Sequence, residues 1–368
     1  MKVILAGGGT GGHIYPALAV GESLRRQGPA DLELLYIGVA GRMDGRIVGR
    51  SGLPFESVAA GPLRVRSPLA AVRGLWQLFV GTLQAWRLLG RFRPDAVFAT
   101  GGYASVPVGI ASRSRGRSLL LYLPDVNPGW AVRLLSRLAT RIVTTTERSL
   151  GELPAGKSSA VGYPVRSEFW SGDRAGARAR LGLPPDEKVL LVGGASQGAR
   201  RINDAVRDQL EGLLDLCHVL HLTGATDEAK LQEKRDSLPE DKQRRYHVTG
   251  YLDEMADAML AADLAVLRSG ASVLGELPAA GLAAVLVPGV YEGGYNQRAN
   301  ARYMEEQGAA VVLENDDLGR LTDVVRDLLD DDAKRQRMAE AARKLARPEA
   351  ADQIAAMLLD PSLQGVAA

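Results

Sequence analysis

The chain has 368 residues, of which 46% are hydrophobic, and its 45 basic and 43 acidic residues leave a formal net charge of +2. This length predicts two domains of about 150–200 residues, each with enough apolar residues for its own core. The single cysteine, Cys217, excludes an internal disulfide framework and fits a reducing compartment. Met1-Lys2 leads straight into an apolar strand, and no run of about 18 apolar residues exists, so we expect neither a signal peptide nor a transmembrane helix.

The first half of the chain alternates short apolar runs with helical stretches. The predicted strands are 3–6, 32–37, 96–100, 118–122 and 141–144. The predicted helices are 15–27, 44–49, 70–91, 106–114 and 131–138. Strands separated by helices indicate a parallel sheet with right-handed crossovers. The segment 162–165 predicts the end of this alternation. The charged stretch that follows it, up to Asp186, predicts a connection to the second half of the chain.

The second half repeats this alternation. The predicted strands are 189–192, 218–222, 247–249, 264–267, 284–287 and 310–312, with helices between them, and 332–359 is helical by composition. The fold class is therefore α/β, with two doubly wound domains. We expect an N-terminal domain over residues 1–162, a C-terminal domain over 163–345, and a helical segment, 346–368, that packs back on the N-terminal domain.

Both halves open with an apolar strand, a glycine-rich turn and the start of a helix. The first turn is Gly7-Gly8-Gly9-Thr10-Gly11-Gly12-His13, and the second is Gly193-Gly194-Ala195-Ser196-Gln197-Gly198-Ala199-Arg200. The backbone N–H groups at such a helix start attract anions, so each turn predicts a phosphate-binding site. We expect the two domains to face each other across a cleft, with one phosphorylated ligand on each side.

The first turn also satisfies G-x-G-x-x-G over residues 7–12, which alone is weak evidence for a dinucleotide site. A nicotinamide-binding unit needs an acid at the end of the second strand. That strand ends at residues 35–38, and Asp31 and Glu33 come too early, so a nicotinamide dehydrogenase is a weakened alternative. His13, at the mouth of the turn, can serve as a general base, or it can merely cap the helix.

Polar residues and glycines follow other predicted strands. Residues 100–103, Thr-Gly-Gly-Tyr, are expected beside the first turn, although an ordinary tight turn has the same spacing. In the second half, 268–272 lead into a helix with Glu276, whose carboxylate can accept both hydroxyls of a ribose. A solvated acid near a helix start fits that position too. Residues 295–297 with Asn300 form a polar cluster that suits sugar hydroxyls or solvent.

The stretch between Gly61 and Leu120 is basic and contains an amphipathic helix. Asp95 is its only acid, against nine arginines: Arg64, Arg66, Arg73, Arg87, Arg91, Arg93, Arg113, Arg115 and Arg117. Apolar residues recur at helical spacing at Leu75, Phe79, Leu83 and Trp86, with Trp76 alongside and Arg87 in the basic rim. This pattern is typical of an interfacial helix on anionic lipid, and packing against the sheet is the alternative.

The sequence recommends no metal site. It has no Asp-x-Asp pair at a suitable strand end, and strand alternation separates His218 from His221, although Cys217 adjoins His218.

Taken together and in order, the motifs resemble those of one family. The matching segments are Gly8–His13, Thr100–Tyr103, Gly162–Arg166, Gly194–Arg200, Arg268–Ala271 and Glu276–Gly281. Over nearly its whole length the chain resembles the MurG family of glycosyltransferases, in glycosyltransferase family 28. The resemblance implies the GT-B fold, with two Rossmann-like domains and an active site in the cleft. It implies inverting transfer of GlcNAc from UDP-GlcNAc to the C4 hydroxyl of MurNAc in lipid I, which yields lipid II for peptidoglycan synthesis, cell shape and division.

The resemblance also assigns residues by position. The implied donor-binding residues are Arg166, Ser196, Gln197, Leu252, Ala271, Ser272, Glu276 and Gln297. The implied acceptor-binding residues are Thr10, Gly11, Gly12, His13, Gly101, Gly102, Tyr103 and Asp125. His13 is the first candidate for the general base and Asp125 the second. The membrane-facing residues are Leu75, Trp76, Phe79, Trp86 and Arg87.

The implied partners are UDP-GlcNAc, lipid I, the anionic inner leaflet and other cell-wall synthesis proteins. No cofactor, metal or nucleic acid is implied, and the expected location is the cytoplasmic face of the bacterial membrane, as a peripheral protein.

The chain departs from the family at one segment of the acceptor side. The family usually has His-Glu-Gln-Asn where this chain reads Tyr122-Leu123-Pro124-Asp125. The departure leaves two alternatives open. One is a GT-B transferase with another lipid acceptor, such as diacylglycerol. The other is a non-catalytic protein that binds a sugar nucleotide or a polyprenyl phosphate, against which the presence of His13, Glu276 and Gln297 argues.

Overall fold

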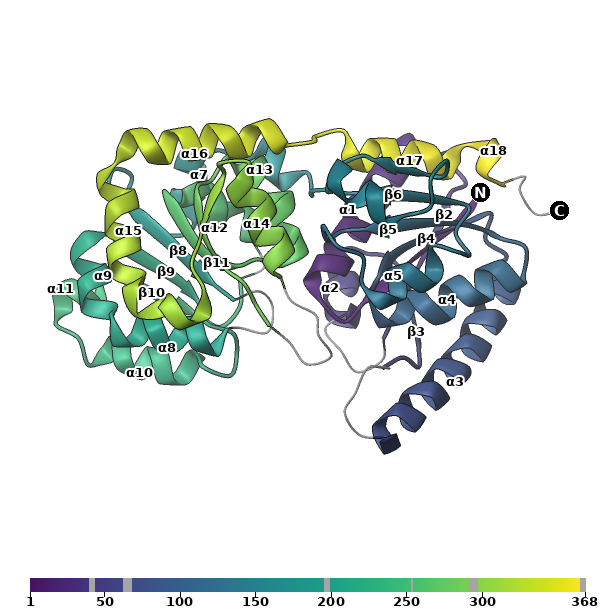
Figure 1. Cartoon of the computed structure of the whole chain (residues 1–368), viewed down its shortest axis with the longest axis horizontal. Helices are drawn as coiled ribbons and strands as arrows, with labels where there is room; N and C mark the ends of the chain where they lie inside the picture. The colour runs from purple at the N-terminus through teal and green to yellow at the C-terminus, as the bar shows by residue number, and fades with distance from the viewer. Residues whose placement is uncertain (40–43, 62–67, 195–198, 253, 291–296, 365–368) are drawn as a thin grey trace. The chain divides into compact units, whose positions relative to one another are not determined.

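The computed structural model describes residues 1–39, 44–61, 68–194, 199–252, 254–290 and 297–364. The chain divides into two compact units, each built on its own sheet (Figure 1). Unit 1 comprises Met1–Arg166 and Arg347–Ala368, and unit 2 comprises Ser167–Val290 and Asn296–Ala346.

Unit 1 is a parallel sheet of seven strands in the order β3-β2-β1-β4-β5-β6-β7. The strands are β1 Lys2–Gly8, β2 Glu33–Val39, β3 Phe55–Val58, β4 Ala96–Gly101, β5 Ser118–Leu123, β6 Arg141–Thr144 and β7 Ser158–Ala160. The helices are α1 Gly11–Gln27, α2 Asp44–Arg50, α3 Pro68–Phe92, α4 Gly102–Ser114, α5 Trp130–Leu135, the 3₁₀ helix η1 Glu147–Glu152, α17 Ala350–Leu359 and α18 Pro361–Gln364.

The core of unit 1 explains its parallel pairing. Val3, Ile4 and Leu5 of β1 are completely buried, as expected of a central strand covered by helices on both faces. α17 lies against α1, where Asp352 accepts a hydrogen bond from Ser23 Oγ at 2.5 Å and pairs with Arg26. The last part of the chain is thus held to unit 1 by both apolar and charged contacts.

Unit 2 is a parallel sheet of six strands in the order β10-β9-β8-β11-β12-β13. The strands are β8 Val189–Gly193, β9 His218–Leu222, β10 Tyr246–Thr249, β11 Leu264–Arg268, β12 Ala284–Val287 and β13 Ala310–Val312. Helices precede or follow these strands: α6 Glu168–Ser171, α7 Arg174–Arg180, α8 Arg200–Asp208, α9 Leu210–Leu216, α10 Glu228–Asp236, α11 Glu240–Gln243, α12 Met255–Ala261, η2 Ala271–Leu274, α13 Glu276–Ala280, α14 Arg298–Glu306, η4 Asn315–Arg320, α15 Leu321–Asp330 and α16 Asp332–Leu345.

The prediction of two parallel α/β domains is confirmed, and the differences are local. The edge strands β3 and β7 were not predicted, because short and partly exposed runs carry little apolar signal. The expected connection up to Asp186 contains α6 and α7. The stretch 332–359 is helical as predicted, but it forms two helices, α16 and α17, which are separated at Pro348 because proline has no N–H group to continue the helical hydrogen bonds.

The strand order of each sheet reverses at one place. In unit 1 the chain builds outward from β1 to β3 and then returns to the other side of β1 with β4, and in unit 2 β8 and β11 are related in the same way. In open parallel sheets, ligands bind beyond the carboxyl ends of the strands at such a switch point. The ends of β1, β4, β8 and β11 are therefore where a ligand is expected.

No helix in the described part of the chain is long and apolar enough to cross a bilayer.

Candidate active site

The two glycine turns of unit 1 meet at its switch point. Gly8 and Gly102 form a parallel bridge between the ends of β1 and β4. Gly101 and Gly102 have φ angles of 89° and 75°, which a side chain disfavours. A Cβ atom at Gly102 would also lie 3.2 Å from Cδ2 of His13, and one at Gly101 would lie 3.1 Å from its Cε1. The histidine ring therefore rests directly on the second turn, and glycine is what allows this approach.

His13 lies in the first turn of α1, and its ring is oriented by β4. Nδ1 is 2.7 Å from the backbone oxygen of Thr100, and Thr100 Oγ1 donates to the oxygen of His13 at 2.6 Å. Because a carbonyl only accepts, the proton of the neutral imidazole belongs on Nδ1, which leaves a lone pair on Nε2. Within the described residues Nε2 has no hydrogen-bond partner. The idea that His13 merely caps the helix is wrong, since the cap position is Thr10.

A buried carboxylate that the sequence did not single out holds the first turn in place. Asp44, the first residue of α2, is fully buried and accepts from the N–H groups of Gly9 at 3.0 Å and Val39 at 2.9 Å. The turn therefore offers a ligand fewer donors than its sequence predicts. This acid follows β2, as in a dinucleotide site, but its oxygens are occupied by the backbone, which further weakens the nicotinamide alternative.

Residues 122–125, whose sequence differs from the one usual in the family, lie mostly in the core of unit 1. Tyr122, Leu123 and Pro124 are buried, and Tyr122 Oη is 2.7 Å from Thr145 Oγ1. Burial raises the pKa of Tyr122 well above its ordinary value, so it stays a neutral phenol. Asp125 is half-buried, two residues beyond the end of β5, and it is the one member of the segment with substantial exposure.

Arg166 is the last residue of the first segment of unit 1. Its guanidinium carbon is 4.4 Å from the ring centroid of Tyr15, a cation–π contact with α1. Its Nε is buried and has no hydrogen-bond partner among the described residues.

The donor residues assigned to unit 2 lie along the carboxyl edge of its sheet. Leu252 follows β10, Ala271 and Ser272 open η2 after β11, and Glu276 begins α13. Ser196 and Gln197 lie outside the described residues. Glu276 is only 5% exposed, so the alternative of a solvated surface acid is wrong.

Gln297 is buried beside the turn that follows β11. Its Oε1 accepts from Gly289 N at 3.1 Å, and its backbone oxygen accepts from Ser269 Oγ at 3.0 Å. A Cβ atom on Gly270 would lie 3.4 Å from Gln297 Nε2. The amide oxygen is thus occupied by the protein, and the structure gives Nε2 no hydrogen bond to any other described residue. Asn300 supports the same turn, with Nδ2 3.0 Å from the oxygen of Ser269.

A second histidine, His221, helps to anchor α8. The sequence did not predict this role. Asn203, one turn into α8, donates from Nδ2 to the oxygen of Thr223 at 2.8 Å and to Asp227 Oδ2 at 2.7 Å. Both donor hydrogens are thereby used, so its Oδ1, 3.1 Å from His221 Nε2, accepts from a protonated Nε2. His221 Nδ1 then accepts from Tyr246 Oη at 2.8 Å.

This network is fully satisfied and electrically neutral at its histidine. Burial lowers the pKa of His221 to about 3, because charging the ring would cost its desolvation and break the bond from Tyr246. The network ties the first turn of α8 to the end of β9 and, through His221, to Tyr246 at the start of β10. The helix that follows the second glycine turn is thereby fixed to the sheet.

The single cysteine and the two other histidines of unit 2 do not form a cluster with His221. Cys217 is buried, and burial raises the pKa of its thiol to about 12. His218 Nδ1 faces His247 Nε2 at 3.3 Å, and its Nε2 is 3.2 Å from Glu187. No group of three or more metal-ligating side chains was found in the part of the chain that the structure describes.

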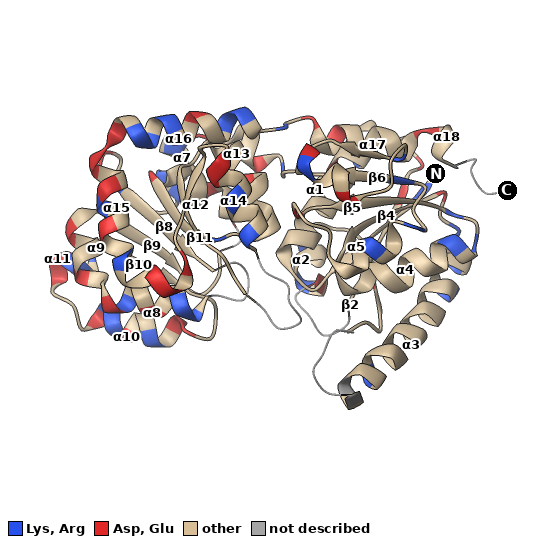
Figure 2. Cartoon of the chain, in the orientation of Figure 1, with Lys and Arg blue, Asp and Glu red and all other residues tan. Residues whose placement is uncertain are grey.

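The apolar stripe of α3 faces outward. Trp76 is 64% exposed and Trp86 45%, and Leu75, Phe79 and Leu83 are exposed as well. The opposite side of α3 packs on α4, with Ala85 and Leu89 buried. Figure 2 shows α3 mostly free of charge along its length, in contrast to the mixed charges on the helices of unit 2. The stripe therefore does not pack on the sheet, as the alternative would require.

Comparisons with known proteins define the class of this chain. The glycosyltransferase family 28 N-terminal domain matches residues 3–144, and the family's C-terminal domain matches residues 188–354. Among solved structures, the crystal structure of Acinetobacter baumannii MurG superposes with a TM-score of 0.71 at 24% identity, covering 97% of this chain and 98% of that one. The fold is thus that of the GT-B glycosyltransferases.

Relatives at higher identity narrow the class further. UDP-N-acetylglucosamine--N-acetylmuramyl-(pentapeptide) pyrophosphoryl-undecaprenol N-acetylglucosamine transferase of Roseiflexus sp. (strain RS-1) is 40% identical, over 97% of this chain and 94% of the relative. The transferase of the same name from Salinibacter ruber is 39% identical, over 96% and 95%. The chain belongs to this family of N-acetylglucosamine transferases.

Proposed function

We propose that the chain transfers GlcNAc from UDP-GlcNAc to the C4 hydroxyl of MurNAc in undecaprenyl-pyrophosphoryl-MurNAc-pentapeptide, the step from lipid I to lipid II. The names of the relatives at about 40% identity support these substrates. Unit 1 takes the acceptor and unit 2 the donor.

The orientation of His13 is the observation that carries this proposal. Its Nδ1 proton is held by the Thr100 carbonyl, so Nε2 is the free base. Nε2 takes the proton of the acceptor hydroxyl as that oxygen bonds to C1 of GlcNAc. The bond between C1 and the diphosphate oxygen breaks, and UDP leaves with the electron pair. The Thr100 carbonyl stabilises the imidazolium that forms, and Asp125 is the second candidate for this base.

On the donor side, the polar groups of unit 2 match the parts of a sugar nucleotide. The buried carboxylate of Glu276 accepts from the ribose hydroxyls, and the backbone at Leu252 reads the uracil. Gln297 Nε2 donates to a GlcNAc hydroxyl. The charge of the leaving diphosphate is stabilised by the turn containing Ser196 and Gln197 and by the start of η2 at Ala271 and Ser272. The resemblance assigns Arg166, at the end of unit 1, to the same diphosphate.

On the acceptor side, the buried position of the departing segment supports lipid I over another lipid. Three of its four side chains are in the core and cannot contact an acceptor, so the change is one of packing. Thr10, Gly11 and Gly12, with Gly101, Gly102 and Tyr103, line the switch point where the acceptor binds.

The acceptor carries a polyprenyl chain, so the protein has to reach a membrane. The exposed stripe at Leu75, Trp76, Phe79 and Trp86, with Arg87 beside it, supports peripheral docking on the anionic inner leaflet. We propose that the protein acts at the cytoplasmic face of the bacterial membrane, among the proteins of cell-wall synthesis, with consequences for cell shape and division.

Transfer of labelled GlcNAc is the direct test. Purified protein is incubated with UDP-GlcNAc and either a lipid I analogue or diacylglycerol. We expect product with the lipid I analogue and none with diacylglycerol. Transfer to diacylglycerol alone would assign a different acceptor, and UDP binding without transfer to either would make the protein a non-catalytic binder.

A further inference from the structure

Arg166, at the end of unit 1, rests on the start of α1. The segment before it is fastened to the first glycine turn by Tyr163, which is buried and whose Oη donates to the backbone oxygen of Gly12 at 3.5 Å. Further along the same segment, the guanidinium carbon of Arg166 lies 4.4 Å from the ring centroid of Tyr15. Two side chains thus hold this segment against the turn that carries His13.

The ring that carries the guanidinium lies over the first turn of α1. A Cβ atom at Gly11 would lie 3.0 Å from Cε2 of Tyr15, so the ring lies close to the glycine backbone. Helical side chains point back toward the N-terminus, which brings a residue over the one four positions before it. Tyr15 therefore presents an aromatic face at the end of α1 where negative charge is favoured.

The ring contact leaves the N–H groups of Arg166 unused by the protein. Within the described residues the Arg166 side chain forms no ion pair and no hydrogen bond, although its Nε is buried. A guanidinium has five N–H donors and no acceptor, and a buried donor without a protein partner is rare in folded proteins. The donors of Arg166 are therefore available to an anion that comes from outside the chain.

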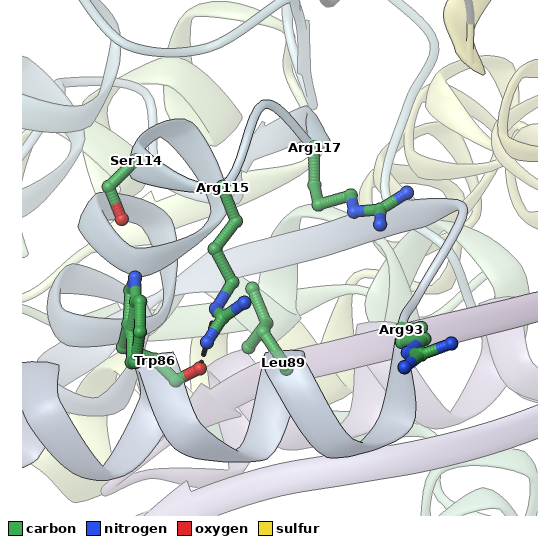
Figure 3. A pocket seen from close by; sticks show the side chains of 7 residues that line it. Trp86, Leu89, Arg93, Ser114, Arg115 and Arg117 are labelled. Atoms are coloured by element: carbon green, nitrogen blue, oxygen red, sulfur yellow. Dashed lines mark hydrogen bonds between the residues drawn. The ribbon is translucent and has the colours of Figure 1, made fainter.

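Arg115, elsewhere in unit 1, shows how the protein holds a guanidinium that serves packing. Its guanidinium carbon is 3.7 Å from the ring centroid of Trp86, and its Nε donates to the backbone oxygen of the same residue at 2.6 Å (Figure 3). A Cβ atom at Gly90 would lie 2.8 Å from that carbon, so the group is closely packed against α3. Arg166 shares the ring contact but, among the described residues, not the hydrogen bond. The Tyr15 ring is thus the contact that orients Arg166.

We propose that Tyr15 is a positioning residue, whose ring holds the Arg166 guanidinium by a cation–π contact for recognition of a substrate diphosphate. Stacking suits this task, because a guanidinium lies flat on an aromatic face while the donors at its edge can bind phosphate oxygens. The inference rests on the proposed transfer and deepens it. UDP-GlcNAc and lipid I each carry a diphosphate with the same chemistry toward Arg166, so the test separates the two.

Four variants of the full chain provide the test. Tyr15→Leu removes the ring, Tyr15→Phe keeps it, and Arg166→Ala removes the guanidinium. Phe92→Leu is the matched control, because Phe92 is also half-buried and has a cation, Lys2 Nζ, 5.4 Å from its ring centroid. That pair lies at the end of β1 opposite the glycine turn.

Titration with UDP and with uridine, which lacks the diphosphate, measures the donor side, and the KM for a lipid I analogue measures the acceptor side. We expect Tyr15→Leu to weaken recognition of one diphosphate by about three- to thirtyfold. On the donor side, UDP affinity falls and uridine affinity stays the same. On the acceptor side, UDP affinity stays the same and the KM for the lipid I analogue rises. Tyr15→Phe and Phe92→Leu should behave like the wild type in both assays.

The coupling between the two side chains decides the result. In the Arg166→Ala background, Tyr15→Leu should have no further effect, since the group that it positions is gone. Equal losses in both backgrounds would overturn the proposal, because Tyr15 would then act independently of Arg166. A loss in Tyr15→Phe as large as in Tyr15→Leu, or no loss in either assay for Tyr15→Leu, would overturn it as well.

A second series keeps the proposal testable even if Tyr15→Leu disturbs folding. Phenylalanines of increasing ring fluorination at position 15 keep the packing and weaken the attraction between the ring face and a cation stepwise. We expect recognition of the diphosphate to fall in step with fluorination, and a flat series would refute the cation–π role. UDP titration does not require turnover. Coupled loss of UDP affinity in a protein that transfers no GlcNAc would therefore refute the proposed activity alone, whereas normal transfer without coupling would refute the role of Tyr15 alone.

Discussion

The two units use the same strand–turn–helix opening but stabilise it by opposite means. In unit 1 the turn is held by the carboxylate of Asp44, and the adjacent His13 keeps one ring nitrogen without a partner among the described residues. In unit 2 the helix is held by Asn203 and by His221, whose two ring nitrogens are both hydrogen-bonded. The comparison teaches that a histidine near a glycine turn is available for chemistry only where the protein leaves one nitrogen unpaired.

The largest effect is expected at His13. His13→Ala should lower kcat by about 10²- to 10⁴-fold, because the general base is lost, while the dissociation constant for UDP-GlcNAc stays the same. Steady-state transfer assays and calorimetric titration with the donor measure the two quantities.

His13→Asn is the matched control for that substitution. Its side-chain amide can still donate to the Thr100 carbonyl, but it has no equivalent of Nε2. A kcat as low as that of His13→Ala supports the base. Recovery of near-normal kcat in His13→Asn would make His13 a structural residue, and Asp125→Asn would then be the variant to measure.

Asn203 should be the most sensitive position in unit 2. Asn203→Leu leaves the Thr223 carbonyl, Asp227 and His221 without their partner, and we expect unfolding free energy to fall by about 2–4 kcal/mol. Chemical denaturation measures this. A double-mutant cycle with His221→Leu sharpens the result, since losses that add fully would mean that the two side chains do not act as one network.

Substitutions at Glu276 test whether unit 2 binds the donor, UDP-GlcNAc. Glu276→Ala should weaken UDP-GlcNAc binding by about ten- to a hundredfold, as expected when a charged hydrogen-bond acceptor is removed. Glu276→Gln keeps one acceptor and should lie between the wild type and Glu276→Ala. A donor dissociation constant that is unchanged in both variants would refute the ribose assignment.

The smallest expected effect is the contribution of His221 to the pH dependence of the unfolding free energy. The pKa of His221 is about 3 in the folded chain and near 6.5 when unfolded, so below pH 6.5 the unfolded chain binds a proton that the folded chain does not. Its stabilising contribution is complete above pH 6.5 and declines toward pH 3, by at most about 1.4 kcal/mol per pH unit. His247, with a pKa of about 4, acts in the same direction.

The contribution of His221 is measured by comparing the denaturation midpoints of the wild type and His221→Gln between pH 7 and pH 4.5. The carboxylates titrate alike in both proteins, so their contribution cancels. We expect the variant to show the shallower loss on acidification. Parallel curves would mean that the His221 pKa is not depressed, and the contrast with His13 would then fail.

Much of the architecture could be predicted from the order of the residues. Fully apolar runs such as 3–6 and 189–192 have to be buried on both faces, which requires parallel strands with helical crossovers. The glycine turns and the stripe at 75–86 followed from local chemistry, because glycine permits particular backbone angles and helical spacing collects side chains on one face. The break at Pro348 could also have been found in this way.

Other features depended on side chains that meet only in the folded chain. Asp44 is 35 residues from Gly9, the backbone oxygen that orients His13 is 87 residues away, and Asn203 is 18 residues from His221. No local pattern predicts that the Tyr122 hydroxyl meets Thr145, 23 residues away. Local sequence therefore determined the elements and the turns, whereas tertiary packing decided which polar atoms are already paired and which remain available to a substrate.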